Sequence, residues 1–223
     1  MTTLTSLLAR RREPGRPFVT FYDLGSGERV ELSTVTTANW VAKTCGLLVD
    51  DLDVEPGTRV RIGLPTHWER VVWALACWQV GAVVVDTDAE VGVTGPDLDA
   101  SEDVRVALSL RPLGLPFESA PAGFVDYNGV VAGHPDVFVP VDEPGEDDLA
   151  LGLGGLVITH AALVAGAGAD RARRLLVDAD LAAECAAVVA AAAGDGSLVL
   201  VTGGTPADVE RVAAQEHAEP VRP

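Results

Sequence analysis

Basic residues are scarce in this 223-residue chain, and lysine is nearly missing from it. Lys43 is the only lysine among sixteen basic residues, and 33 acidic residues bring the formal net charge to −17. A chain of that charge repels polyanions, whereas binding to a phosphate backbone depends on dense Lys and Arg. We therefore expect no nucleic-acid partner.

Cysteines and long apolar runs are also few. The three cysteines, Cys45, Cys77 and Cys185, lie far apart without Cys-x-x-Cys spacing, which is typical of reduced thiols and predicts neither a disulfide framework nor a zinc site. No apolar run reaches the roughly 18 residues of a membrane span. The charges of Arg10–Arg12 follow the first short apolar stretch instead of preceding it, unlike a signal peptide. These features predict a cytoplasmic protein without membrane contact.

The hydrophobic fraction of 48% is that of a globular protein, and its periodicity predicts an alternation of helices and strands. Apolar residues at helical spacing predict a helix that begins at a Ser33 cap and ends near Leu52. Alternating apolar residues at 60–64 predict a strand. Thr66 and Glu69 have the spacing of a capping box that would start a second helix. The apolar run Ala82–Val85 then predicts a buried parallel strand.

The rest of the chain continues the pattern less regularly. Short strands are expected at Val104–Leu108 and Val137–Val139, and a further strand at Leu149–Leu153. The remaining expected elements are a helix capped by Thr159 that runs to about Arg174, a helix capped by Asp180, a strand at Leu198–Val201 and a helix capped by Thr205. Together they predict a layered α/β fold with a mostly parallel sheet and helices on both faces. We expect one domain over residues 1–223, with 1–146 and 147–223 as possible subregions.

A glycine-rich turn before the Thr159 cap is the first candidate for anion binding. Gly154 and Gly155, with Thr159 and His160 behind them, would form a shortened phosphate cradle at a helix N-terminus. A tight strand-to-helix turn is the simpler interpretation, because no Lys, Arg, Ser or Thr accompanies the glycines. His160 has no acid or cysteine paired with it in the sequence, which favours a structural role.

A second glycine-rich turn offers two hydroxyl groups. Thr202, Gly203, Gly204 and Thr205 follow a predicted strand and precede a predicted helix, so their amides and hydroxyls would suit an anion. Helix capping by Thr205, with Pro206 at the first helical position, explains the same residues without a ligand.

Acidic residues are candidates for a cation site only at one point. Asp86, Asp88 and Glu90 come at the end of a predicted parallel strand, where ligands of α/β proteins bind. A solvated acidic turn is the alternative, and it is the usual reason for such a cluster. The four histidines show no metal-ligand spacing, so we expect no metal site.

Trp40 and Leu47 indicate a surface for a partner. They lie seven positions apart and off the main apolar stripe of the first predicted helix, so they would form a second apolar patch. Such a patch favours contact with a partner protein or a second copy of the chain. Packing of both side chains in the core is the alternative.

Several segments, taken in order, resemble one family. These segments are Leu32-Ser33, Pro56-Gly57-Thr58-Arg59-Val60, Trp78–Val85, Val157–Leu163 and Gly196–Val201. They are similar to the N-terminal region of the adenylate-forming superfamily, which contains the AMP-binding acyl-CoA and aryl-CoA synthetases. The resemblance implies the fold of the N-terminal part of an acyl-CoA synthetase. We expect a closer match to a short actinobacterial group of such proteins.

The chain departs from that family where the chemistry is concentrated. The family carries a Ser/Thr/Gly-rich phosphate loop closed by Pro-Lys-Gly, whereas this chain has only Leu149–Gly154 at that place. The family's adenine motif, its ribose-binding Thr-Gly-Asp and its C-terminal domain with a catalytic lysine lie beyond the region that this chain matches, and Lys43 lies in the first helix.

These departures imply a pseudoenzyme that is inactive alone and acts by binding a partner, an acyl group or a nucleotide. ATP or AMP would be a ligand only if the ancestral nucleotide site survives. The alternative is a residual ligase subunit that completes its active site with another chain.

Overall fold

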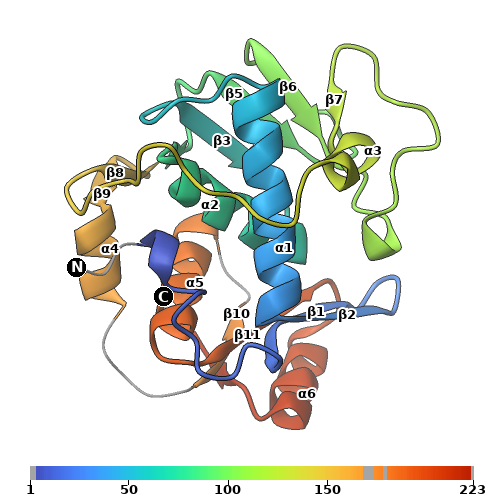
Figure 1. Ribbon diagram of the computed structural model, residues 1–223. Coiled ribbons are helices and arrows are strands. Elements are labelled where there is room, and N and C mark those ends of the chain that lie inside the picture. The colour runs from blue at the N-terminus through green and yellow to red at the C-terminus, as the bar shows by residue number, and fades with distance from the viewer. Residues whose placement is uncertain (1–3, 168–172, 178–179, 222–223) are drawn as a thin grey trace.

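The computed structural model describes residues 4–167, 173–177 and 180–221, which form two β-sheets with helices between and outside them (Figure 1). No helix among these residues is long and apolar enough to cross a membrane. The mostly parallel α/β arrangement predicted from the sequence is confirmed.

The smaller sheet has five strands, and it joins the two ends of the chain. Its strands lie in the order β12 (Glu219–Pro220), β10 (Arg174–Val177), β11 (Ser197–Thr202), β1 (Pro17–Asp23) and β2 (Glu28–Ser33). All neighbours are parallel except β1 and β2, which form a hairpin. The sequence analysis predicted β11 but neither the β1–β2 hairpin nor β10.

The larger sheet has seven strands and is parallel up to its last pair. Its order is β7 (Val125–Asp126), β6 (Val104–Ala107), β5 (Val91–Thr94), β3 (Arg59–Gly63), β4 (Val83–Val85), β8 (Leu149–Leu153) and β9 (Leu156–Thr159). Only β8 and β9 pair antiparallel. Since β1 and β2 belong to the smaller sheet while β8 and β9 belong to the larger one, the possible subregions 1–146 and 147–223 do not correspond to the two sheets.

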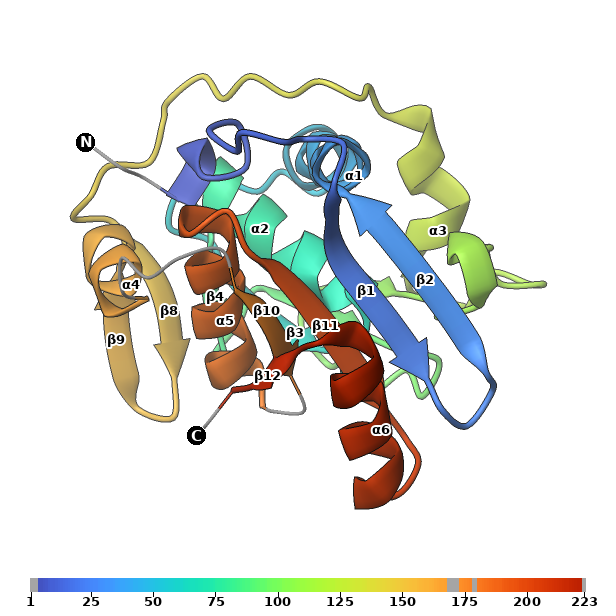
Figure 2. The same ribbon diagram turned by 90° about the horizontal axis from the view of Figure 1, so that it is seen from below.

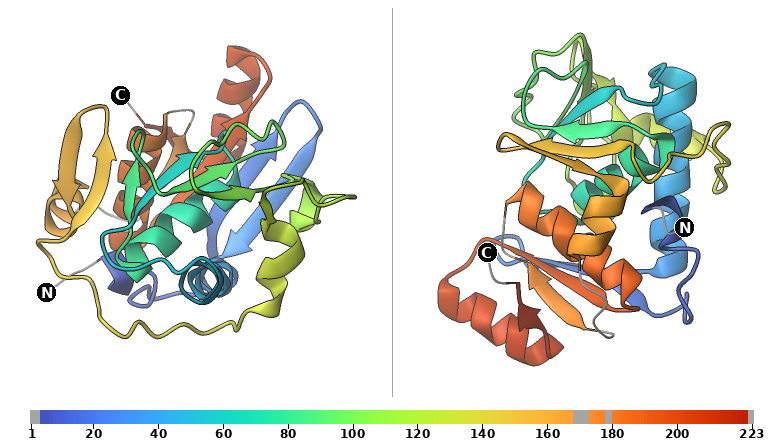
Figure 3. Two further views of the ribbon diagram at one scale, coloured as in Figure 1. Left: turned by 90° about the horizontal axis from the view of Figure 1, so that it is seen from above. Right: turned by 90° about the vertical axis from the view of Figure 1, so that its left-hand side faces the viewer.

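The helices form the middle layer and two outer covers. They are α1 (Thr34–Gly46), α2 (Trp68–Val80), α3 (Tyr127–Val130), α4 (His160–Gly166), α5 (Leu181–Ala193) and α6 (Pro206–Glu216), with a π-helix at Leu47–Asp51 and 3₁₀ turns at Leu4–Ser6, Pro112–Gly114 and Val131–Gly133. Figure 3 shows α5 between the two sheets, and α2 contacts strands of both. Helix α6 covers part of the outer face of the smaller sheet (Figure 2).

Helix α2 is buried nearly all round, as its continuous apolar sequence predicts. Trp68, Trp73 and Trp78 are almost fully buried. The predicted capping box at its start is wrong. The His67 ring accepts the Glu69 amide through Nδ1 at 3.2 Å, and Thr66 instead accepts a hydrogen bond from Arg70. The Glu69 carboxyl group cannot complete a capping box because it is turned into the core.

Two other expectations are corrected by the structure. The helix after Thr159 ends at Gly166, well before Arg174, which begins strand β10. The apolar residues after Arg174 pair with β11 and so extend the sheet. The segment Val137–Val139 lies outside both sheets, because only Phe138 packs against the core while both valines are exposed.

A buried ion pair links the middle layer. Arg70 of α2 donates to both carboxylate oxygens of Glu184 in α5, at 2.9 and 2.5 Å. Arg70 also donates to the Leu64 carbonyl oxygen. Burial raises the pKa of Glu184, although the Arg70 charge opposes this effect. The pair therefore fixes how α2 and α5 lie against each other.

Candidate functional site

The glycine pair before the Thr159 cap forms a hairpin turn between two strands and not the expected strand-to-helix turn. Gly154 and Gly155 have φ of 59° and 77° and connect β8 to β9. Two consecutive positive φ values suit the two-residue turns of twisted hairpins. The Gly154 N–H donates to the Asp86 carboxylate at 2.7 Å. The turn thus presents a negative group where a phosphate would need positive ones.

Replacing Gly155 by alanine is expected to lower the free energy of unfolding by about 1 kcal/mol, because the left-handed backbone disfavours a Cβ atom. Gly166 provides a matched control, since it lies in helix α4 with open space around it. Its replacement by alanine is expected to be neutral or to stabilise by up to about 1 kcal/mol. Urea denaturation measures both, and equal effects at the two positions would contradict the argument.

Thr159 and His160 serve the start of α4. The Thr159 hydroxyl accepts the Ala162 amide at 3.2 Å, so the predicted cap is present. The His160 side chain is fully buried, and neither ring nitrogen has a hydrogen-bond partner among the described residues. Burial lowers the pKa of His160, while the Asp148 charge works against this shift. His160 is thus a neutral core residue out of reach of a ligand in solution.

The second glycine-rich turn is closed by its own acid. Thr205 and Asp208 form a capping box in which the Asp208 carboxylate accepts both the Thr205 hydroxyl, at 2.7 Å, and its amide. Hydrogen bonds from Arg211 and Thr205 hold the pKa of Asp208 well below its usual range. A carboxylate therefore occupies the place that an anion would take beside Thr205.

Gly203 and Gly204 in the same turn have φ of 71° and 75°. The Thr202 carbonyl accepts the Leu24 amide at 2.9 Å, and an Asp23 oxygen lies beside Gly203. The predicted candidates are also far apart, because α4 follows the edge strand β9 of one sheet while α6 follows β11 in the other (Figures 1 and 2). The structure does not assemble them into one site.

The acidic residues after β4 hold the backbone in place. Asp86 is bound to Gly154, and Glu90 accepts the Arg59 amide at 2.6 Å. Asp88 lies within 3.8 Å of the Arg59 guanidinium. Among the described residues no group of three or more His, Cys, Asp or Glu side chains is arranged to hold a metal ion.

The face expected around Trp40 and Leu47 packs within the chain. Leu47 is fully buried, and Trp40 is half-buried with its ring edge-on to Trp68 at a centroid distance of 5.1 Å. Core packing thus accounts for the position of Leu47. Binding of a partner protein remains a prediction, which the packing of Leu47 and Trp40 does not test.

A buried acid lies near the start of α2. The Glu69 carboxyl group accepts the Asn128 side-chain amide at 2.6 Å through Oε1, whereas Oε2 has no hydrogen-bond partner. Burial raises the pKa of Glu69 to about 8; the Asn128 bond lowers it and the charge of Glu28 adds to the rise. Burial also lowers the pKa of the neighbouring His67 to about 4. Both groups are neutral near pH 7 and closed to solvent.

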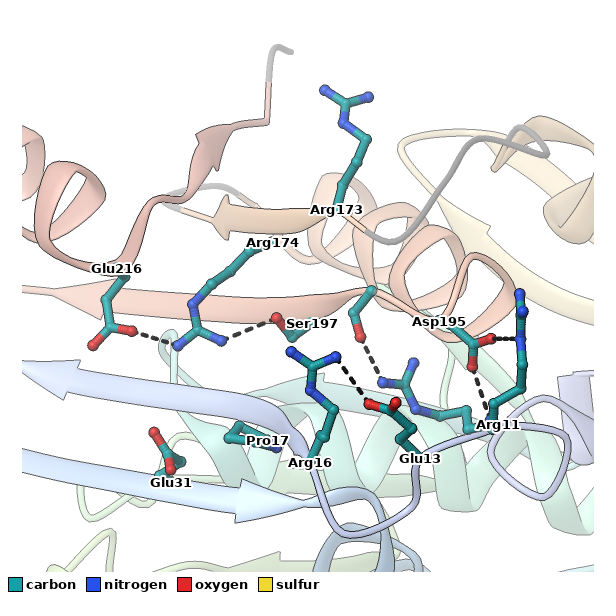
Figure 4. A pocket seen from close by; sticks show the side chains of 12 residues that line it. Arg11, Glu13, Arg16, Pro17, Glu31, Arg173, Arg174, Asp195, Ser197 and Glu216 are labelled. Atoms are coloured by element: carbon teal, nitrogen blue, oxygen red, sulfur yellow. Dashed lines mark hydrogen bonds and ion pairs between the residues drawn. The ribbon is translucent and has the colours of Figure 1, made fainter.

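A concave feature lined by many charged side chains lies elsewhere, over the amino ends of three parallel strands. It begins where β1, β10 and β11 start, at Pro17, Arg174 and Ser197, and it has a volume of about 590 Å³ (Figure 4). Helix α6 touches its border through Glu216 only. We call this feature the arginine cavity. Its position is opposite to the carboxyl ends of strands, where α/β proteins usually bind ligands.

Charged side chains of both signs line the arginine cavity. The basic ones are Arg11, Arg12, Arg16, Arg173 and Arg174, and the acidic ones are Glu13, Glu31, Asp195 and Glu216. The Arg173 side chain points away from the hollow and pairs with Glu219, which leaves four arginines and four acidic residues in the hollow (Figure 4). The cavity is therefore close to neutral in a chain of −17.

Two arginines form the fixed wall of the cavity. Arg11 is buried and donates to the carbonyl oxygens of Ala191 and Gly196 at 3.0 and 2.7 Å. Arg174 donates to Ser197 and to Glu216 at 3.0 and 2.6 Å (Figure 4). These bonds hold both guanidinium groups in one orientation.

Two other arginines are exposed and held only by surface ion pairs. Arg16 donates to Glu13 at 2.9 Å, and Arg12 donates to Asp195 at 2.7 Å through Nε. The sequence analysis missed this cavity. The signal was the pair of arginine runs at Arg10–Arg12 and Arg173-Arg174, although nothing in the sequence shows that they meet.

A relative with clear similarity matches the chain over nearly its whole length. It is 36% identical over 237 residues to a protein of Mycobacterium tuberculosis (strain ATCC 25618 / H37Rv) described as a TIGR03089 family protein. The alignment covers 97% of this chain and 98% of that protein. No family model matches the sequence.

Solved structures share the fold at low sequence identity. The Brucella canis acyl-CoA synthetase has a TM-score of 0.80 at 18% identity, and the match covers 97% of this chain and 46% of that one. The coronafacic acid ligase of Pectobacterium brasiliense scores 0.73 at 12%, covering 96% and 47%. The N-terminal domain of FACL13 from M. tuberculosis scores 0.72 at 16%, covering 98% and 62%. The chain thus spans about half the length of the first two enzymes.

Proposed function

The chain belongs to the TIGR03089 family and has the fold of the N-terminal part of acyl-CoA synthetases, and from this we propose that it is a non-catalytic relative that acts by binding a small molecule or a partner protein. In this role the protein keeps the scaffold of the synthetases but does not activate an acid with ATP.

The β8–β9 turn carries this proposal. In the resembling enzymes a hydroxyl-rich and glycine-rich loop with a lysine neutralises the phosphates of ATP, as chemistry at a polyphosphate requires. Here Gly154 and Gly155 make the whole connection, and their nearest charged partner is the carboxylate of Asp86. A phosphate placed at this turn would meet repulsion instead of neutralisation.

An adenylation assay tests the proposal. Purified protein is incubated with ATP, mixed fatty and aryl acids and hydroxylamine, and in parallel with ATP, the acids and labelled pyrophosphate. We expect neither acyl hydroxamate nor labelled ATP above the level of a reaction without protein. A full-length acyl-CoA synthetase serves as the positive control for both readouts.

Two outcomes would overturn the proposal. Acyl hydroxamate or labelled ATP formed by the purified chain would show adenylation by this protein alone. Activity that arises only when a second purified protein is added, and that neither protein has by itself, would show a ligase subunit that completes its active site with another chain.

A further inference from the structure

We propose that the arginine cavity binds an organic phosphate that carries at least two negative charges, a ligand class that rests on the binding function proposed above and makes it specific. The site comprises the exposed guanidinium groups of Arg12 and Arg16 together with the fixed wall formed by Arg11 and Arg174.

The charge distribution is the first argument. The chain as a whole repels anions, yet in this one hollow four arginines balance the four acidic residues. Charges beyond about 8–10 Å are largely screened at physiological salt, so the acidic residues elsewhere in the chain have little effect inside the cavity. The net charge of the chain therefore does not keep an anion out of the cavity.

The weak pairing of the exposed arginines is the second argument. The Arg16 and Glu13 side chains are 75% and 64% exposed, and Arg12 is 87% exposed. Exposed pairs of this kind contribute roughly 0–1 kcal/mol, so they exchange readily for a stronger partner. Arg12 contacts Asp195 through its side-chain Nε, which leaves its two terminal nitrogens for another acceptor.

Arg11 and Arg174 in the wall are held in place by hydrogen bonds, unlike the side chains of a mobile surface patch. Arg174 is held by Ser197, by Glu216 and by Thr20, which is fully buried. Arg11 is held by two backbone carbonyl oxygens and by the Thr34 hydroxyl at 2.9 Å. A ligand therefore meets a preformed basic surface and has to order only Arg12 and Arg16.

The chemistry and the size of the cavity select the ligand class. The planar guanidinium fork matches phosphate oxygens in pairs, which the single lysine of the chain cannot do from its place in α1. A volume of about 590 Å³ lies within the usual range of small-molecule sites, roughly 300–1,000 Å³. The cavity thus has room for an organic body beside the phosphates.

Isothermal titration calorimetry with adenosine diphosphate as the probe tests this site. We expect binding at one site per chain, weaker in high salt, with pyrophosphate also binding and adenosine not binding. Arg16→Ala is expected to weaken the affinity at least tenfold, because a charge-assisted hydrogen bond is lost. Glu13→Gln is expected to strengthen it several-fold, because the competing carboxylate is removed.

Arg211→Ala is the matched control. Arg211 and Asp208 form an exposed pair three residues apart at 2.8 Å, like Arg16 and Glu13, but outside the cavity. This variant changes the net charge equally and should leave the affinity unchanged. Circular dichroism melts of all variants establish that each is folded.

Other outcomes would overturn the inference. Absence of binding to the wild-type chain, or equal affinities of the Arg16→Ala and Arg211→Ala variants, would exclude the cavity as the site. Dimerisation in sedimentation experiments that is lost in Arg16→Ala, without binding of the probe, would assign the cavity to a second copy of the chain. Adenylation activity bears only on the proposed function, since the titration measures binding without turnover.

Discussion

Replacing Glu184 by leucine is expected to lower the free energy of unfolding by about 3–5 kcal/mol. The change leaves the Arg70 guanidinium between α2 and α5 without the carboxylate that accepts two of its hydrogen bonds. Both side chains are more than nine-tenths buried, so water cannot replace the lost partner. Guanidinium chloride denaturation, analysed as a two-state transition, measures the effect.

The double variant Arg70→Met with Glu184→Leu is the control for this prediction. It removes both charges and fills the space with apolar atoms, so it should recover at least half of the lost stability. Recovery is incomplete because the Leu64 carbonyl and Thr66 also lose their bonds to Arg70. A cost below about 1 kcal/mol for the single variant would contradict the importance of the pair.

Raising the pH from 6.5 to 8 is expected to lower the free energy of unfolding by about 2 kcal/mol, and Glu69→Gln is expected to abolish this loss. The pKa of Glu69 is raised to about 8 in the folded chain, from an ordinary value near 4.5. Its proton stabilises the fold fully at low pH, and this stabilisation is lost as the pH rises through about 8.

The titration of His67 changes the free energy of unfolding in the opposite direction. It therefore confines the loss of stability to the range above pH 6.5. The pKa of His67 falls from 6.5 to about 4 in the folded chain, so its contribution is complete above pH 6.5 and is lost as the pH falls. Between about pH 4.5 and 6.5 the two slopes cancel. Above pH 6.5 Glu69 alone of these two groups contributes, at about 1.4 kcal/mol for each pH unit.

Urea denaturation at a series of pH values checks this prediction. Glutamine replaces Glu69 with the shape of the protonated acid and can still accept the Asn128 bond. Glu55→Gln, which removes an exposed carboxylate, should keep the wild-type slope. A Glu69→Gln variant with the same loss between pH 6.5 and 8 would show that another group is responsible.

The sequence was sufficient to predict elements that depend only on neighbouring residues. Ser33, Thr159, Asp180 and Thr205 each cap the helix predicted for them, because a cap depends only on residues within one turn. The buried strand before Thr202 was likewise predicted from its apolar run, and β11 occupies that place.

Elements that depend on distant partners were missed. Strand β10 was not predicted, because Arg174–Val177 is defined by its pairing with β11 and not by its own pattern. Glu69 was expected to form a capping box with Thr66, because nothing local shows that Asn128 faces it across the core. The arginine cavity was not predicted for the same reason, since Arg16 and Arg174 meet only after the smaller sheet has formed.

The pairing of β1 with β11 has a consequence for the order of events during synthesis. Val19 lies opposite Leu198, so β1 leaves the ribosome well before the strand that covers its edge. Contacts so distant along a chain slow folding, and an uncovered strand edge promotes aggregation meanwhile. A chain stalled before Ser197 would leave that edge of β1 exposed.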